Sequence, residues 1–143
     1  MIHFFNKQQE EYIIDAIQEA ERVTSGEVRV HMERKLKGTV LETATNVFAK
    51  LKMDATEQRN GVLIFLAPRQ KQFAIIGDKG INEKVPDGFW DDVRDVMQKQ
   101  FRAEQFVEGI CDGVQLIGKK LQEHFPYQKN DRNELPDEIS YGD

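Results

Sequence analysis

Apolar residues in this chain recur with two periods, and each change of period marks a predicted element. Near the N-terminus, Ile13 and Ile17 recur at helical spacing behind Asn6, a residue type that caps helices. The next segment, EVRVHME at residues 27–33, alternates apolar and polar side chains, which is typical of a half-buried strand. Helical spacing then returns between residues 41 and 51. The first part of the chain therefore predicts the order helix, strand, helix.

The centre of the chain carries its most apolar segment. VLIFLA at residues 62–67 is apolar on both faces, as expected of a central strand that is covered on both sides. A short polar turn at residues 68–72 separates it from FAII at 73–76, and this spacing predicts an antiparallel hairpin. The strand-helix-strand passage over residues 27–67 is long enough for a right-handed parallel crossover. We therefore expect a mixed sheet with helices on both faces.

Two further helices and a polar tail complete the chain. The apolar helix positions are Phe89, Val93, Val96, Met97 and Phe101, followed by Phe106, Ile110, Val114, Ile117 and Leu121. Gly109 and Gly113 would let the second of these helices approach a neighbour closely. We predict an α/β fold, a three-layer α/β/α sandwich with a mixed, mostly parallel central sheet and one hairpin. This domain is expected over residues 1–125, and a flexible acidic C-terminal tail over residues 126–143.

Composition narrows the class of protein and its compartment. Hydrophobic residues make up 39% and charged residues 31% of the chain, which is ordinary for a soluble globular protein. The net charge of −5 and the absence of a basic stripe argue against nucleic acid as a partner. A single cysteine, Cys111, excludes intrachain disulfides, and no apolar run is long enough to span a membrane. Without a signal-peptide pattern at the N-terminus, we expect a cytoplasmic protein.

The strongest candidate for a site is the acidic stretch AIIGDKGINEKVPDGFWDD at residues 74–92. Gly77 allows the backbone to leave the sheet sharply, and Asp78, Asp87 and Asp91 gather where a strand ends and a helix begins. Carboxylates and loop carbonyls are the oxygen ligands that calcium prefers. The same acids would also offset the helix macrodipole at a helix start, so a metal site and a plain helix start are both open interpretations.

Other motifs fail on chemical grounds. Residues 113–120 nearly spell a phosphate-binding loop, but a lysine occupies the Ser/Thr position and the segment lies inside a helical pattern. Cys111 lacks the arginine six residues later that a cysteine-phosphatase loop requires. His31 and His124 have no second histidine at ligand spacing, so we assign both of them structural or solvated roles.

Several segments in combination resemble one family. TSGEVRV at residues 24–30, NGVLIFLA at 60–67, VPD at 85–87 and FRAEQFVEGI at 101–110 are similar to the TPM domain. Such domains occur in thylakoid-lumen proteins linked to photosystem II repair, in a receptor modulator and in many bacterial proteins. The resemblance extends over about residues 6–125 and implies a three-layer α/β/α sandwich.

The resemblance also implies a function. Family members are associated with calcium binding through acidic residues at one end of the sheet, and a plant member with acid phosphatase activity. Glu27 and Asp87 match family positions, whereas Asp78 and Asp91 are added from local chemistry alone. Two features depart from the family. Pro68-Arg69 stands where an acidic pair is common, and no export or membrane segment is recognised here although most members are exported or membrane-anchored.

Three classes of function follow from these observations. The first is a domain that binds a divalent cation, calcium before others, and acts as an accessory module with a protein partner. Its metal ligands would be Glu27, Asp78, Asp87 and Asp91. The second is a metal-dependent phosphatase, for which no standard motif is present. The third is an interaction module that needs no ion. We place the first ahead of the others, and the sequence identifies no catalytic residue.

Overall fold

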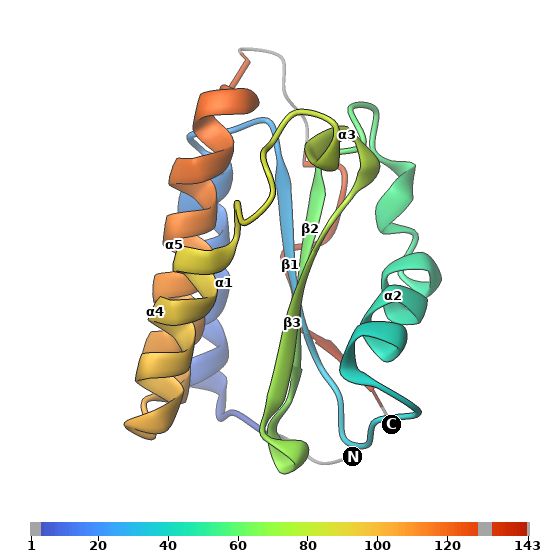
Figure 1. Ribbon diagram of the computed structural model, residues 1–143. Helices are drawn as coiled ribbons and strands as arrows, with labels where there is room; N and C mark the ends of the chain where they lie inside the picture. Colours follow the sequence, from blue (N-terminus) through green and yellow to red (C-terminus); the bar gives the residue numbers. More distant parts are fainter. Residues whose placement is uncertain (1–3, 129–132, 143) are drawn as a thin grey trace.

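The computed structural model describes residues 4–128 and 133–142 as one α/β domain (Figure 1). Its helices are α1 (Lys7–Glu21), α2 (Val40–Lys50), α3 (Lys79–Asn82), α4 (Asp91–Arg102) and α5 (Phe106–His124). Its strands are β1 (Glu27–Met32), β2 (Gly61–Ala67), β3 (Gln72–Gly77) and β4 (Ser140–Tyr141). Two short 3-10 helices, η1 (Met53–Ala55) and η2 (Pro68–Gln70), lie in the connections.

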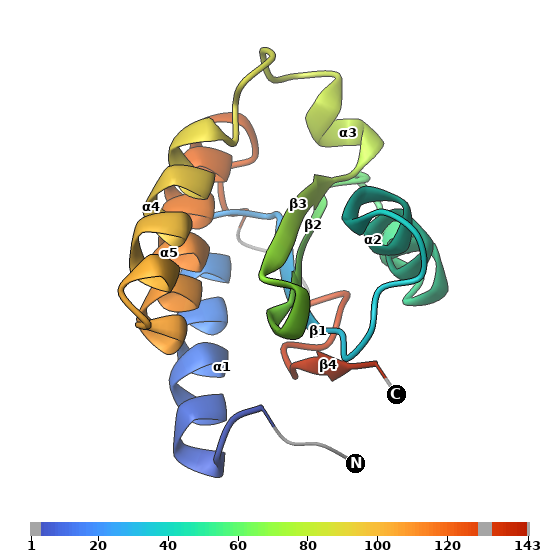
Figure 2. The same ribbon diagram turned by 60° about the horizontal axis from the view of Figure 1, so that its bottom comes forward.

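The sheet has the strand order β3-β2-β1-β4. β1 pairs in parallel with both β2 and β4, whereas β2 and β3 form the antiparallel hairpin. Helices α1, α4 and α5 lie on one face of the sheet and α2 lies on the other, as both views show (Figures 1 and 2). The predicted sandwich, with its mostly parallel sheet and its single hairpin, is confirmed.

Strand β2 divides the core into two halves because its side chains alternate between the faces of the sheet. Val62, Ile64 and Leu66 pack with α1, α4 and α5 in the larger cluster. Leu63 and Phe65 pack on the other face with residues of α2. Every residue of β2 is buried, as predicted for a central strand covered on both sides.

Local sequence signals account for the helices. Asn6 and Gln9 form the predicted capping box at the start of α1. Helices α4 and α5 pack closely because α5 has glycines at the contact. A Cβ atom on Gly113 would lie 2.5 Å from the sulfur of Met97, and one on Gly109 would lie 2.7 Å from the Phe101 ring. The expected close approach at these two glycines is confirmed.

The described part of the C-terminal segment differs from the flexible tail predicted over residues 126–143. Residues 140–141 form β4 at the edge of the sheet, and Leu135 and Ile139 are buried. Leu135 packs in the α2-side cluster and Ile139 in the larger one. The tail prediction, which rested on composition, was wrong for this part because two isolated apolar residues, Leu135 and Ile139, give no periodic signal. Their burial depends on a strand edge more than 100 residues earlier in the chain.

Candidate functional site

Glu27, the first predicted ligand, is occupied by backbone donors. Its carboxylate oxygen Oε1 accepts hydrogen bonds from the N–H groups of Glu134 and Leu135, at 2.6 and 2.7 Å. The residue is 3% exposed. Burial raises the pKa of Glu27 to about 7, although the two N–H donors act in the opposite direction. Glu27 therefore anchors the C-terminal segment, a role that the strand pattern did not reveal.

Asp78, the second predicted ligand, is also fully engaged. Its side chain accepts from the N–H of Lys79 at 2.7 Å and so caps α3. Both carboxylate oxygens accept from the guanidinium of Arg59, at 2.8 and 3.0 Å. The loop must pass very close here, because a Cβ atom on Gly80 would lie 2.1 Å from the carbonyl oxygen of Gln58. Asp78 therefore fixes the turn after β3.

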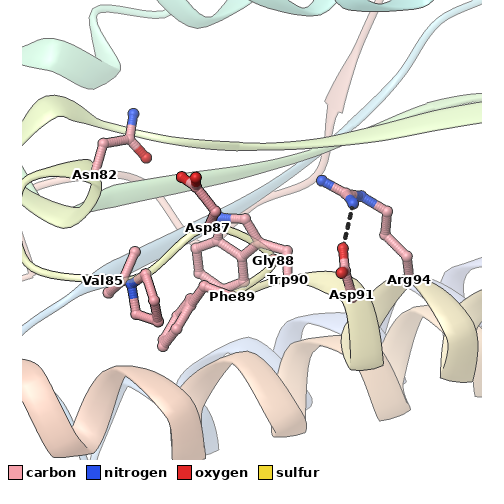
Figure 3. Close-up of a pocket in the computed structure, with 9 residues that line it drawn as sticks. Asn82, Val85, Asp87, Gly88, Phe89, Trp90, Asp91 and Arg94 are labelled. Atoms are coloured by element: carbon pink, nitrogen blue, oxygen red, sulfur yellow. Dashed lines mark hydrogen bonds and ion pairs between the residues drawn. The ribbon is translucent and has the colours of Figure 1, made fainter.

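Asp87 and Asp91 lie together in one hollow between the end of α3 and the start of α4 (Figure 3). The hollow has a volume of about 260 Å³ and is lined by Asn82, Val85, Pro86, Asp87, Gly88, Phe89, Trp90, Asp91 and Arg94. Asp91 forms an ion pair with Arg94 at 2.9 Å. Asp87 is exposed, and no hydrogen bond or ion pair links it to another of the described residues. The hollow thus offers one free carboxylate and one that is paired.

The start of α4 is fixed to α5 behind this hollow. Asp92 forms an ion pair with Lys120 at 2.8 Å, and this bond holds the pKa of Asp92 below its usual range. The Lys120 ammonium also lies over the ring of Phe89, 4.6 Å from its centroid. The aromatic wall of the hollow is therefore held in place, while Asp92 serves as a structural acid of the helix start.

The four predicted carboxylates do not converge on one point. Within the residues that the structure describes, no group of three or more His, Cys, Asp or Glu side chains is arranged to hold a metal ion. Glu27 and Asp78 are absent from the lining of the hollow, and their oxygens already accept hydrogen bonds. Of the four predicted ligands, the hollow therefore brings together Asp87 and Asp91, and its lining also includes Asn82.

Sequence reasoning missed a second group of carboxyls beside the C-terminal segment. Glu21 accepts from the N–H of Val28 at 3.0 Å and hydrogen-bonds Asp137. Burial first, and then the bond to Asp137, raise the pKa of Glu21 to about 10. A hollow of about 440 Å³ opens here, lined by Gln18, Glu21, Arg22, Thr24, Ser25, Glu27, Tyr127, Asn133 and Asp137. No local signal could have revealed the pair, because Asp137 lies 116 residues beyond Glu21.

Three solved structures share this architecture. The BA42 protein of the psychrophilic bacterium Bizionia argentinensis is 46% identical, with a TM-score of 0.94 over 99% of this chain and 98% of that one. An N-terminal domain from P. gingivalis is 20% identical, with a TM-score of 0.68 over 88% of this chain and 83% of that one. The N-terminal domain of cg2496 from Corynebacterium glutamicum is 11% identical, with a TM-score of 0.64 over 95% of this chain and 80% of that one. The last two show similarity of fold alone.

Membership of a family rests on the sequence profile as well as on the fold. No curated protein matches the chain. In the part of the chain that the structure describes, no helix is long and apolar enough to cross a membrane, and the cytoplasmic location stays a prediction.

The profile of the TPM domain matches residues 2–120, which is most of the chain. The BA42 protein, which is 46% identical, has the same fold. This chain belongs to the TPM domain family.

Proposed function

We propose that this TPM domain is an accessory module that binds a divalent cation, calcium before others, in the hollow lined by residues 82–94. The observation that carries the proposal is the free carboxylate of Asp87, which shares that hollow with Asp91 and Asn82 (Figure 3). A carboxylate that already accepts several hydrogen bonds, as Asp78 does, would have to give them up to bind an ion. Asp87 has no such bond to lose to any of the described residues.

The donor set predicts a weak site. Calcium takes roughly six to eight oxygen ligands, and Asp87, Asp91 and Asn82 supply at most about five, so water must complete the shell. Asp91 would also exchange its ion pair with Arg94 for the cation. With only two carboxylates in an open hollow, we expect a dissociation constant of about 10⁻⁴–10⁻³ M, the range of low-charge calcium sites.

The lining of the hollow favours binding over catalysis at this position. It contains no serine, threonine, cysteine or histidine that could act as nucleophile or base. The chain's one thiol is not activated, because burial raises the pKa of Cys111 to about 11. Of the two aromatic residues in the lining, Trp90 is buried in the core and Phe89 is partly exposed, so Phe89 is the one that a protein partner could contact. A bound cation would thus form part of a surface that a protein partner recognises.

Calcium titration of metal-stripped protein, followed by amide chemical shifts, tests the proposal. We expect saturable shifts confined to the hollow, and at least about a tenfold loss of affinity in Asp87→Asn, equivalent to about 1.4 kcal/mol. Asp95→Asn is the matched control, because Asp95 is an exposed acid of α4 outside the lining. Asp78→Asn should leave the affinity unchanged and lower the stability instead.

Two results would count against the proposal. The first is an absence of shifts at millimolar calcium, and the second is an equal loss of affinity in Asp87→Asn and Asp95→Asn. Either would leave the acids of residues 87–92 as a helix start only. Hydrolysis of p-nitrophenyl phosphate that requires a metal ion and disappears in Asp87→Asn would identify a metal-dependent phosphatase instead.

A further inference from the structure

A hydrogen-bonded chain of serine, histidine and glutamate lies at the edge of the sheet, away from the hollow of residues 82–94. His31, near the end of β1, has its Nδ1 atom 2.9 Å from the hydroxyl oxygen of Ser140 on β4. Its Nε2 atom lies 2.8 Å from a carboxylate oxygen of Glu33. The imidazole therefore connects a hydroxyl to a carboxylate through its two nitrogens.

The partners of His31 determine where its protons lie. A carboxylate accepts hydrogen bonds only, so Glu33 requires the proton of the neutral ring on Nε2. The lone pair of Nδ1 is then free to accept the O–H of Ser140. Burial is the main cause that lowers the pKa of His31, which keeps the ring neutral and able to take up a proton. The ring is stacked on Phe65 with an interplanar angle of 13°.

The position in the sheet is one where α/β folds place ligand sites. β1 and β4 are parallel neighbours, and His31 pairs with Ser140 in their register. From β1 the chain passes through α2 to β2 on one side, whereas β4 lies on the other side and follows the helices of the opposite face (Figure 2). His31 and Ser140 therefore lie near the carboxyl ends of two parallel strands, the edge of an open α/β sheet at which ligands bind.

A cationic group stands beside this chain of hydrogen bonds. Arg29 precedes His31 by two residues on β1, so both side chains leave the same face of the strand. Its Nε atom is buried and has no hydrogen-bond acceptor among the described residues. The charge of Arg29, together with that of Lys50 on α2, acts on His31 and lowers its pKa. An N–H donor with a positive charge suits the negative charge that develops when a hydroxyl attacks an ester.

We propose that Ser140 is the nucleophile of an acyl-transfer site, with His31 as its general base and Glu33 as the positioning residue. Ser140 Oγ forms a bond to the carbonyl carbon of a carboxylic ester while its proton passes to Nδ1 of His31. The carbon–oxygen bond to the leaving alcohol then breaks, and that alcohol takes the proton from His31. A water molecule then attacks the acyl carbon while its proton passes to Nδ1 of His31. The bond from that carbon to Ser140 Oγ breaks, and Oγ takes the proton back from His31. The charges of Arg29 and Lys50 favour esters that carry an acidic group.

A serine-reactive fluorophosphonate tests the nucleophile directly. Its phosphorus bonds to Oγ, fluoride leaves, and His31 takes the hydroxyl proton, so the reaction reports activation without knowledge of the natural ester. The chain has two serines, and Ser25 is an internal control because it is buried beside Asn60 and Gln58 with no imidazole bond. Intact mass and peptide mapping give the rate at each serine. We expect Ser140 to react at least about tenfold faster in the folded protein than in urea.

The pH profile separates an activated serine from a structural hydrogen bond. Labelling should rise with pH as His31 loses its proton. Among the described charged groups that act on His31, Glu33 is the one acid and raises the pKa of His31. Arg29 and Lys50 lower that pKa. Glu33→Gln should therefore move the midpoint of labelling to lower pH and reduce the plateau rate at least about tenfold.

Two labelling results would contradict the role of Ser140 as a nucleophile. Labelling of Ser140 that is no faster in the folded protein than in urea would make the contact a structural link between β4 and β1 only. A profile that does not change in Glu33→Gln would lead to the same conclusion. Both measurements use the folded full-length chain and are read at Ser140 itself, so neither depends on the stability of a Ser140 variant.

Discussion

Replacing Glu21 with glutamine should make the protein more stable above neutral pH. In the folded protein Glu21 is half-buried, and its pKa is raised to about 10, first by burial and then by the bond to Asp137. The folded state therefore holds a proton that the unfolded chain releases above the ordinary glutamate pKa of 4.5. The stabilisation by this proton is complete below that value and is lost as pH rises toward 10. Glutamine keeps an acceptor for Val28 and a donor for Asp137 without needing a proton.

The size of the effect follows from linkage. Between the two pKa values, one group lowers the free energy of unfolding by about 1.4 kcal/mol per pH unit. From pH 6 to pH 8 the contribution of Glu21 is at most about 2.7 kcal/mol, or roughly 5–10 °C in melting temperature for a domain of this size. The pKa of Glu27, raised to about 7, adds a slope of its own at lower pH, but that slope is shared by both proteins.

Thermal unfolding followed by circular dichroism at several pH values measures the difference. The melting temperature of Glu21→Gln minus that of the original protein should increase steadily from pH 6 to pH 8. Glu11→Gln is the matched control, since Glu11 is an exposed acid on the same helix, and it should give a constant difference. Parallel curves for Glu21→Gln and the original protein would refute the shared proton between Glu21 and Asp137.

Three further changes test the architecture. Ile64→Asp places an unpaired charge at a site that is 0% exposed, so the variant should fail to fold, as measured by circular dichroism. Leu135→Ala should lower the free energy of unfolding by about 2–5 kcal/mol in urea titrations, whereas a flexible tail predicts no change. Gly80→Ala should destabilise the protein by more than about 1 kcal/mol, because the new methyl group would lie 2.1 Å from the carbonyl oxygen of Gln58.

Most of the fold could be predicted because its signals are local. The alternation in β1 and the doubly apolar β2 identify two strands, and the polar turn after Ala67 identifies a hairpin. The half-buried state predicted for β1 was wrong, because β1 lies between β2 and β4 and its polar residues Glu27 and His31 are buried as well. Capping by Asn6 and the small residues of α5 are equally local. The C-terminal segment could not be predicted in this way. Leu135 is held by Glu27 across 108 positions, and such a contact leaves no periodic trace in either segment.

The same reasoning explains the outcome for the candidate site. Asp87 and Asp91 were expected together and do line one hollow, because only three residues separate them in the sequence. Glu27 was grouped with them from the family resemblance and Asp78 from local chemistry, yet each meets donors that come from elsewhere in the chain. His31 was given a structural or solvated role because no second histidine stands at ligand spacing, and its partner Ser140, 109 positions away, left no local signal. Spacing in sequence therefore predicted neighbours within a loop and failed for contacts between segments.

The hydrogen-bond donors around each carboxylate in this domain determine its role. A carboxylate whose oxygens are not occupied by structural donors is therefore a candidate for function. Glu27 faces two backbone N–H groups, and Asp78 faces a guanidinium, so both stabilise the fold. Glu33 faces an imidazole that in turn contacts a hydroxyl, an arrangement that can transfer a proton. Asp87 faces solvent and has its coordination capacity intact. Nearby donors thus give some acidic residues a structural role, whereas the two proposed activities rest on Glu33 and Asp87, whose neighbours leave their oxygens able to act.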